Sequence, residues 1–179
     1  MVNIFLKTGR LHNKDHGRKA FSWAAENGNM EIVKFMVDIF IEDKYDFHSV
    51  GQAIIYASQN GRVEIVGFLA DKIKGVGDDK KRRNLEGYLS IALVRAARYG
   101  KADIIKLLLL KGANVNKKSF IDMDMTALIW AAKNNHPEIV KMLIDSGADN
   151  NITDKNGKTA LMYAEENGHQ EIVRLLKKQ

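Results

Sequence analysis

Apolar and polar positions along the chain repeat at intervals of 33, 39, 35 and 33 residues. Five segments align without gaps, and each carries apolar residues at the spacing of two short helices. Each segment begins with an alanine: Ala20, Ala53, Ala92, Ala127 and Ala160. A single glycine or asparagine separates the two halves: Gly28, Gly61, Gly100, Asn135 and Gly168. Helices commonly end on a left-handed residue, which these two residue types tolerate best. The pattern therefore predicts five helix–turn–helix units.

The second half of each segment is apolar on most of its circumference. In the fourth segment, an acidic residue, Glu138, is followed by the apolar residues Ile139, Val140, Leu143 and Ile144. A carboxylate in the first turn interacts favourably with the helix dipole. A helix that is apolar on most sides must lie between neighbours, which one unit cannot provide. We therefore expect the five units to stack side by side.

Two stretches carry the most specific signature. Residues 107–116 read LLLLKGANVN, and residues 143–164 read LIDSGADNNITDKNGKTALMYA. With the period near 33, the paired alanines and the recurring Glu-Ile-Val, they resemble the ankyrin repeat. The likeness covers about Ala20 to Lys178. It implies an all-α ankyrin-repeat solenoid of stacked helix-turn-helix units with some β-hairpin fingers.

The boundaries follow from this alignment. The chain is expected to be one ankyrin-repeat domain, 1–179. Residues 1–19 resemble the tail and finger of a truncated preceding repeat. Full repeats are expected at about 20–52, 53–91, 92–126, 127–159 and 160–179. In the last unit, Glu165 replaces the second alanine, which indicates the polar outer face of a C-terminal cap.

The chain also departs from the family's Thr-Pro-Leu-His motif. The proline is alanine in every unit, and the threonine remains only as Thr126 and Thr159. The histidine, which in the family forms an interhelical hydrogen bond, is replaced by Ser22, Ile55, Val94, Ile129 and Met162. We expect apolar packing to take the place of that bond.

The connections after the first two units lack the family's finger sequence. They read DIFIEDKYDFHSVGQ at 38–52 and DKIKGVGDDKKRRNLEGYLS at 71–90. We expect neither to form a hairpin, and the second helices before them to be longer or irregular. The basic run Lys80–Arg83, which four acidic residues accompany within 71–87, is interpreted as a solvated loop or a helix start.

The helical register gives the candidate binding residues. Counting about 100° per residue from Leu128, Ala131 and Ala132 face into the stack, whereas Trp130 lies on the opposite side. In ankyrin arrays that side borders the concave groove used for partners, so the resemblance implies the same here. The same register position in the five units holds Trp23, Tyr56, Arg95, Trp130 and Tyr163, and Arg98, Tyr99 and Lys133 lie beside it.

Two interpretations of these residues remain open. Tryptophan, tyrosine and arginine are enriched in interface hot spots, which favours a partner-binding groove. Alternatively, the aromatic side chains are partly buried under the fingers as packing. The asparagines one turn further on, such as Asn134 and Asn167, are equally consistent with solvated helix surface.

Composition narrows the function class. The chain is 45% apolar and 28% charged, which is typical of folded proteins, and it has no cysteine, which excludes disulfides and thiolate chemistry. No apolar run is long enough to span a membrane or to act as a secretory signal. We therefore expect a cytoplasmic protein, in the host cell if it is a secreted effector. The net charge of +6 favours acidic partners without establishing nucleic-acid binding.

Candidate catalytic and metal-binding groups are not found. His12 and His16 have helical spacing but fall in an apparent finger, and His136 and His169 follow the turns, where the family carries structural histidines. No phosphate loop or nucleophile elbow is present. We expect no enzyme activity, no metal and no cofactor.

The function predicted from the sequence is a monomeric, non-catalytic module or adaptor that binds another protein, such as an acidic-apolar segment, through its groove and fingers. The alternative is a nucleic-acid or anionic-ligand binder that uses the basic mid-groove and Lys80–Arg83.

Overall fold

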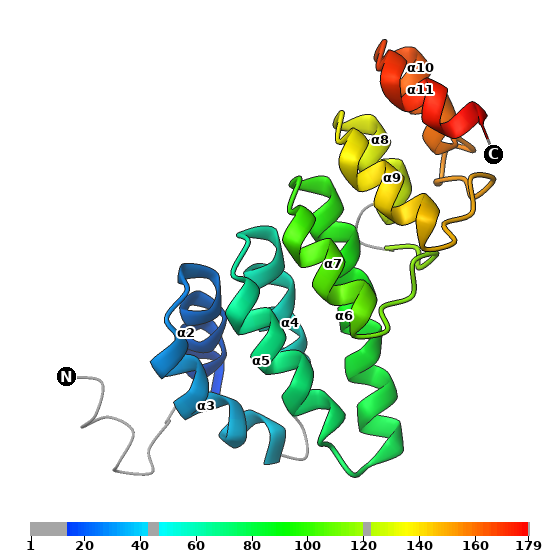
Figure 1. Cartoon of the computed structure of the whole chain (residues 1–179). Coiled ribbons are helices and arrows are strands. Elements are labelled where there is room, and N and C mark those ends of the chain that lie inside the picture. The colour runs from blue at the N-terminus through cyan, green and yellow to red at the C-terminus, as the bar shows by residue number, and fades with distance from the viewer. Residues whose placement is uncertain (1–13, 43–46, 120–122, 179) are drawn as a thin grey trace.

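The computed structural model describes residues 14–42, 47–119 and 123–178, which form ten helices arranged as five stacked pairs (Figure 1). The first helices of the pairs are α2 (Lys14–Asn27), α4 (Phe47–Gln59), α6 (Asp79–Arg98), α8 (Ala127–Lys133) and α10 (Ala160–Glu166). The second helices are α3 (Met30–Glu42), α5 (Val63–Lys74), α7 (Ala102–Leu110), α9 (Pro137–Asp145) and α11 (Gln170–Lys177). The predicted all-α solenoid is confirmed.

The turns between paired helices have the predicted geometry. All five turn residues have positive φ, from 59° at Asn135 to 85° at Gly28. At Gly100 a second constraint applies, because a Cβ there would lie 2.8 Å from Cε1 of His136 in the next unit. The turn of one unit thus contacts the turn of the next.

The paired alanines lie between neighbouring first helices. Ala24, Ala57, Ala96, Ala131 and Ala164 are all fully buried. Small side chains at these positions let the helices approach closely, and the branched apolar residues of the second helices fill the space behind them. The core is therefore continuous from α2 to α11.

Apolar packing takes the place of the family's histidine hydrogen bond only in units two, three and four. Ile55, Val94 and Ile129 are buried, as expected. Ser22 is half-buried, and Met162 is 46% exposed.

The first helices differ in length, and this corrects the predicted boundaries. Residues 14–19, expected to belong to a finger before the first unit, are instead the first turns of α2, whereas residues 1–13 lie outside the described part of the chain. Likewise, α4 and α6 begin well before Ala53 and Ala92. The predicted boundaries were placed at the alanines that recur in the five units, and these alanines do not mark where the helices begin.

Helix α6, which has 20 residues, includes the basic run Lys80–Arg83 in its first turns. The run is therefore a helix start, one of the two conformations expected. The absence of a hairpin after unit two is also confirmed, because only four residues separate α5 from α6. The four residues between α3 and α4 lie outside the described part of the chain. Helices α3 and α5, with 13 and 12 residues, are longer than the 9-residue α7 and α9.

The remaining threonines explain where the short first helices begin. Thr126 and Thr159 are the N-caps of α8 and α10, and each side chain accepts a hydrogen bond of 3.3 Å from a backbone N–H. Such a cap satisfies a free donor of the first turn and fixes the helix start. Units one to three lack this threonine, and their first helices extend further toward the N-terminus.

Two fingers precede these capped helices, at residues 111–126 and 146–159. They were expected to be β-hairpins, but the described residues form no strand, and the first finger has only one antiparallel bridge, between Ser119 and Met125. Residues 120–122 lie outside the described part. Hydrogen bonds join the two fingers: Asn116 donates to the carbonyl of Gly147 at 3.3 Å and accepts from the backbone of Asp149 at 2.9 Å.

Candidate functional site

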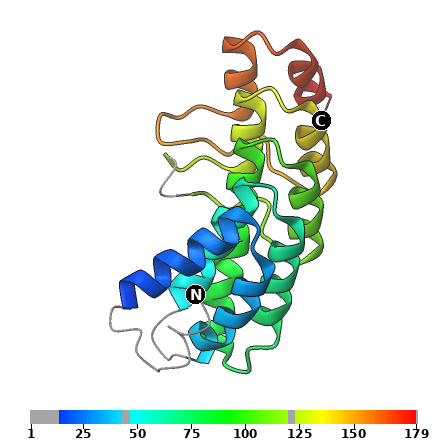
Figure 2. The same ribbon diagram turned by 90° about the vertical axis from the view of Figure 1, so that its left-hand side faces the viewer.

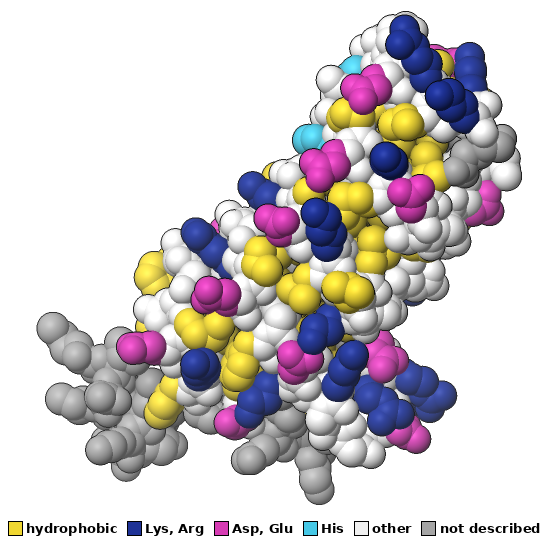
Figure 3. Space-filling model, in the orientation of Figure 1, with side chains coloured by type: hydrophobic (Ala, Val, Ile, Leu, Met, Phe, Trp, Pro, Cys, Tyr) yellow, Lys and Arg dark blue, Asp and Glu magenta, His cyan; other side chains and the backbone are white. Residues whose placement is uncertain are grey.

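The exposed side of the first helices and the two fingers together form what we call the groove face. Seen from the side, the fingers project from the first helices and away from the second helices (Figure 2). The opposite face, formed by the second helices, shows hydrophobic side chains interspersed with charges of both signs (Figure 3). Among the side chains that the structure describes on this face, the most exposed large apolar one is Leu110, at 83%.

The predicted aromatic residues of the groove face divide into two groups. Trp23, Tyr99 and Tyr56 are 59%, 46% and 37% exposed, as expected of contact residues. Trp130 and Tyr163, in contrast, are only 9% and 7% exposed, so packing is the correct interpretation for these two. The two buried rings belong to units four and five, which are the units preceded by fingers.

Cations of the chain itself cover the buried rings. The Arg98 guanidinium lies 4.3 Å from the centroid of Trp130 and 5.6 Å from that of Tyr99. The Lys133 ammonium lies 5.2 Å from Trp130 and 4.8 Å from Tyr163. Each cation thus bridges two rings, an arrangement that cation–π attraction favours. Arg95, one turn before Arg98, is half-buried.

Tyr163 also anchors the second finger. Its hydroxyl donates a 2.7 Å hydrogen bond to Asp154, a buried carboxylate that also accepts from the backbone N–H groups of Asn156 and Lys158. Burial by itself would raise the pKa of Asp154, but these hydrogen bonds together lower it below the usual value. Burial, followed by the hydrogen bond to Asp154 and its charge, raises the pKa of Tyr163 to about 12. At neutral pH, Tyr163 therefore keeps its proton and Asp154 stays ionised, so the hydrogen bond between them is structural.

The asparagines beside the groove position also have a structural role, although their side chains are exposed. Asn134 donates to the carbonyl of Arg98 at 2.7 Å, and Asn167 to that of Lys133 at 3.3 Å. These carbonyls end the first helix of the preceding unit, where intrahelical partners are lacking. These two asparagine side chains are therefore more than solvated helix surface, because each one links its own unit to the preceding unit.

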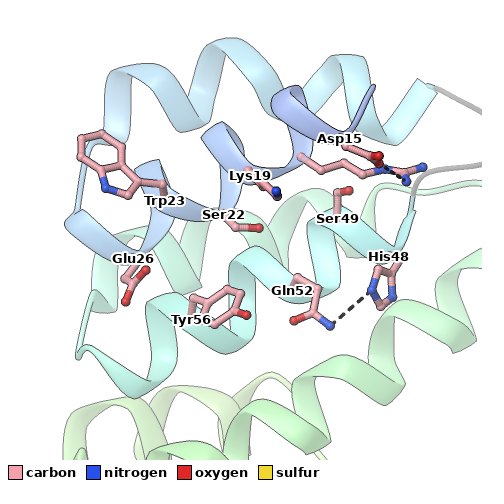
Figure 4. Close-up of a pocket in the computed structure, with 10 residues that line it drawn as sticks. Asp15, Lys19, Ser22, Trp23, Glu26, His48, Ser49, Gln52 and Tyr56 are labelled. Atoms are coloured by element: carbon pink, nitrogen blue, oxygen red, sulfur yellow. Dashed lines mark hydrogen bonds and ion pairs between the residues drawn. The ribbon is translucent and has the colours of Figure 1, made fainter. Parts of the chain in front are cut away.

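A cavity of about 500 Å³ lies where α2 and α4 extend beyond the expected helix starts. It is lined by Asp15, Arg18, Lys19, Ser22, Trp23, Glu26, His48, Ser49, Gln52 and Tyr56 (Figure 4). The sequence analysis identified Trp23 and Tyr56 but not the cavity. The missing threonine caps were the signal that α2 and α4 begin earlier in the chain. These earlier starts supply six of the ten lining residues, which lie between Asp15 and Lys19 and between His48 and Gln52.

One of the four bases in the basic run forms ion pairs within its own helix. Arg82 lies 2.5 Å from Asp79 and 3.8 Å from Glu86, so acids of the same helix compensate it. Arg98 and Lys133 lie on aromatic rings. Nothing in this arrangement points to a surface for nucleic acid.

Among the described residues, no group of three or more histidine, aspartate or glutamate side chains could hold a metal ion. His16 is exposed, and His12 lies outside the described part. Nδ1 of His169 donates a hydrogen bond of 2.9 Å to the carbonyl of Ala132, in line with the structural role expected of this histidine. None of the described helices is long and apolar enough to cross a membrane.

Comparison with known proteins agrees with this architecture. The family model described as ankyrin repeats (3 copies) matches residues 1–84 and 93–179. Over 152 residues the chain is 34% identical to the ankyrin repeat and KH domain-containing protein mask-1 of Caenorhabditis elegans. The match covers 83% of this chain but only 5% of that relative. The chain belongs to the ankyrin-repeat family.

Proposed function

We propose that the chain is a non-catalytic interaction module that binds a partner protein along its groove face. Ankyrin repeats are in general protein–protein interaction modules without enzyme activity. The observation that carries the proposal is the exposure of Trp23, Tyr56 and Tyr99 on one face of the stack. Exposed large aromatic side chains of this kind are the usual anchors of protein interfaces.

The charge of the groove face suggests the chemistry of the partner. Lys133 lies on two rings, and no described carboxylate forms an ion pair with it. A partner segment that places a carboxylate here and apolar groups against Tyr99 would therefore match this half of the face. We propose an acidic-apolar segment for this half, bound by a monomeric chain inside the cell.

The test is an affinity capture from lysate of the native source, at about 0.15 M salt, where the Debye length is about 8 Å. The full chain is compared with a Trp23→Ala/Tyr99→Ala variant. The matched control is Phe35→Ala/Leu110→Ala, which removes two exposed apolar residues from the opposite face. Circular dichroism verifies that all three chains remain equally helical.

The expected result is a protein that the wild type and the control capture and that the groove variant does not. Calorimetry with the purified partner should then show affinity at least about tenfold weaker for the groove variant. Loss of capture with the control alone would move the interface to the second helices. Capture of nuclease-sensitive material, with affinity falling steeply with salt, would replace the proposal by nucleic-acid binding.

A further inference from the structure

The chain contains an occupied cation site in its last unit. The Lys158 ammonium lies 2.7 Å from the Glu166 carboxylate and 5.4 Å from the ring centroid of Tyr163. Tyr163 and Glu166 are three residues apart in α10, so their side chains project from the same side of the helix. A ring and a carboxylate together thus hold one ammonium group, through cation–π attraction and a charge-assisted hydrogen bond.

Unit one has the same pair without its cation. Trp23 and Glu26 occupy in α2 the register positions that Tyr163 and Glu166 occupy in α10. No described residue places a cation on the Trp23 ring or pairs with the Glu26 carboxylate. The ring is 59% exposed, in contrast to the 7% of Tyr163.

The helix extension explains why the chain does not fill this site itself. The residue that corresponds to Lys158 is Arg18, but Arg18 lies inside α2 rather than in a finger. Its guanidinium lies 3.4 Å from Asp15, one turn back along the helix. In unit five, the finger before α10 places Lys158 on the Tyr163 ring. In unit one, the same stretch of chain is part of α2, and the Trp23 ring stays uncovered.

A second aromatic ring lines the same cavity as Trp23 and Glu26. It belongs to Tyr56 in α4, and Figure 4 shows Glu26 and Tyr56 on the neighbouring helices α2 and α4. Unit one therefore has one more aromatic group than the occupied site in unit five. The cavity of about 500 Å³ is open to solvent and has room for a long side chain.

We propose that Trp23, Glu26 and Tyr56 receive a lysine or arginine side chain of the bound partner. This inference rests on the proposed function and adds a second chemical requirement, because the segment must present a base here and an acid at mid-groove.

Lys19 restricts the segment further. It lies four residues before Trp23, about 6 Å along the helix axis, and lines the same cavity. A second base on the partner would be repelled there, whereas a carboxylate would be attracted. In an extended peptide, residues two apart lie about 6.6 Å apart on one side. The segment that fits therefore has a basic residue and an acidic residue separated by one position.

The test uses a display library of random twelve-residue peptides, selected on the full chain. Parallel selections use Glu26→Gln and its matched control Glu166→Gln, which removes the same carboxylate where Lys158 already occupies it. We expect wild type and control to enrich peptides with a lysine or arginine, and Glu26→Gln to lose this enrichment. Replacing the basic residue of a selected peptide by citrulline or norleucine should weaken binding to the wild type about tenfold.

The same experiment distinguishes failure of this inference from failure of the proposed function. Peptides that bind Glu26→Gln as tightly as wild type, yet bind Trp23→Ala/Tyr99→Ala poorly, would overturn the cation site and leave the groove as the binding face. If the selected peptides are insensitive to every groove variant, both proposals fail. A library that enriches no basic peptide on the wild type also overturns the cation site.

Discussion

The ring of Tyr88 in α6 lies against the backbone of Gly51 in α4, so closely that a Cβ at position 51 would be 2.3 Å from the ring. The Tyr88 hydroxyl is 2.8 Å from Nδ1 of His48, one turn earlier in α4. The contact brings the long extension of α6 against the extended start of α4. It therefore helps to hold the start of α4, whose His48 and Gln52 line the cavity, against α6.

Gly51→Ala should destabilise the protein by about 1–3 kcal/mol, because the added methyl group overpacks a rigid ring contact. Urea unfolding followed by circular dichroism measures the change in the free energy of unfolding. Gly87→Ala is the control, since it lies in α6 with no atom within 4 Å of the added Cβ. That control should be neutral or stabilising by up to about 1 kcal/mol. Equal stability of wild type and Gly51→Ala would show that Tyr88 does not lie where described.

Tyr163→Phe should cost about 1–3 kcal/mol at neutral pH, because it removes one hydrogen bond from the buried Asp154 carboxylate. The folded pKa of Asp154 is lowered, so its stabilising contribution is complete above the unfolded pKa of 3.8 and is lost as the pH falls below it. The folded pKa of Tyr163 is raised to about 12, so its contribution is complete below 10.0 and is lost as the pH rises toward 12.

Urea unfolding of wild type and Tyr163→Phe across the pH range checks both signs. The difference in unfolding free energy should be largest between about pH 5 and 9 and decrease toward pH 3 and pH 11. A difference independent of pH would mean that Tyr163 contributes through packing alone.

Lys133→Gln should destabilise the array by about 1 kcal/mol, because the ammonium group lies on the rings of both Trp130 and Tyr163. Lys106→Gln is a suitable control, since Lys106 is exposed on α7. Thermal unfolding should show a lower Tm for the first variant only. If both variants melt like wild type, the ring contacts of Lys133 add nothing to stability.

Thr159→Ala should cost about 1 kcal/mol, because the side chain accepts the hydrogen bond that caps α10. Thr159→Ser keeps the oxygen and should remain close to wild type. Hydrogen exchange would show faster opening of α10 and α11 in the alanine variant. Unchanged exchange there would indicate that the finger, rather than the cap, determines where α10 begins.

The features that the sequence determined by itself depend on residues close together in the chain. Turn residues such as Gly100 and Asn135 require a left-handed backbone, and paired alanines such as Ala131 and Ala132 mark the face between helices. The caps Thr126 and Thr159 act within three residues. Each of these signals depends on residues a turn apart, so the repeat and its all-α stacking could be predicted.

The tertiary structure decided which aromatic residues are exposed. Trp130 and Trp23 share one register position, yet one is covered and the other is not. Arg98 and Lys133 lie on the Trp130 ring, and a finger precedes unit four. In unit one, the extended start of α2 stands where units four and five have a finger. Helical register gives the direction of a side chain, but burial depends on neighbours that come from other units of the stack.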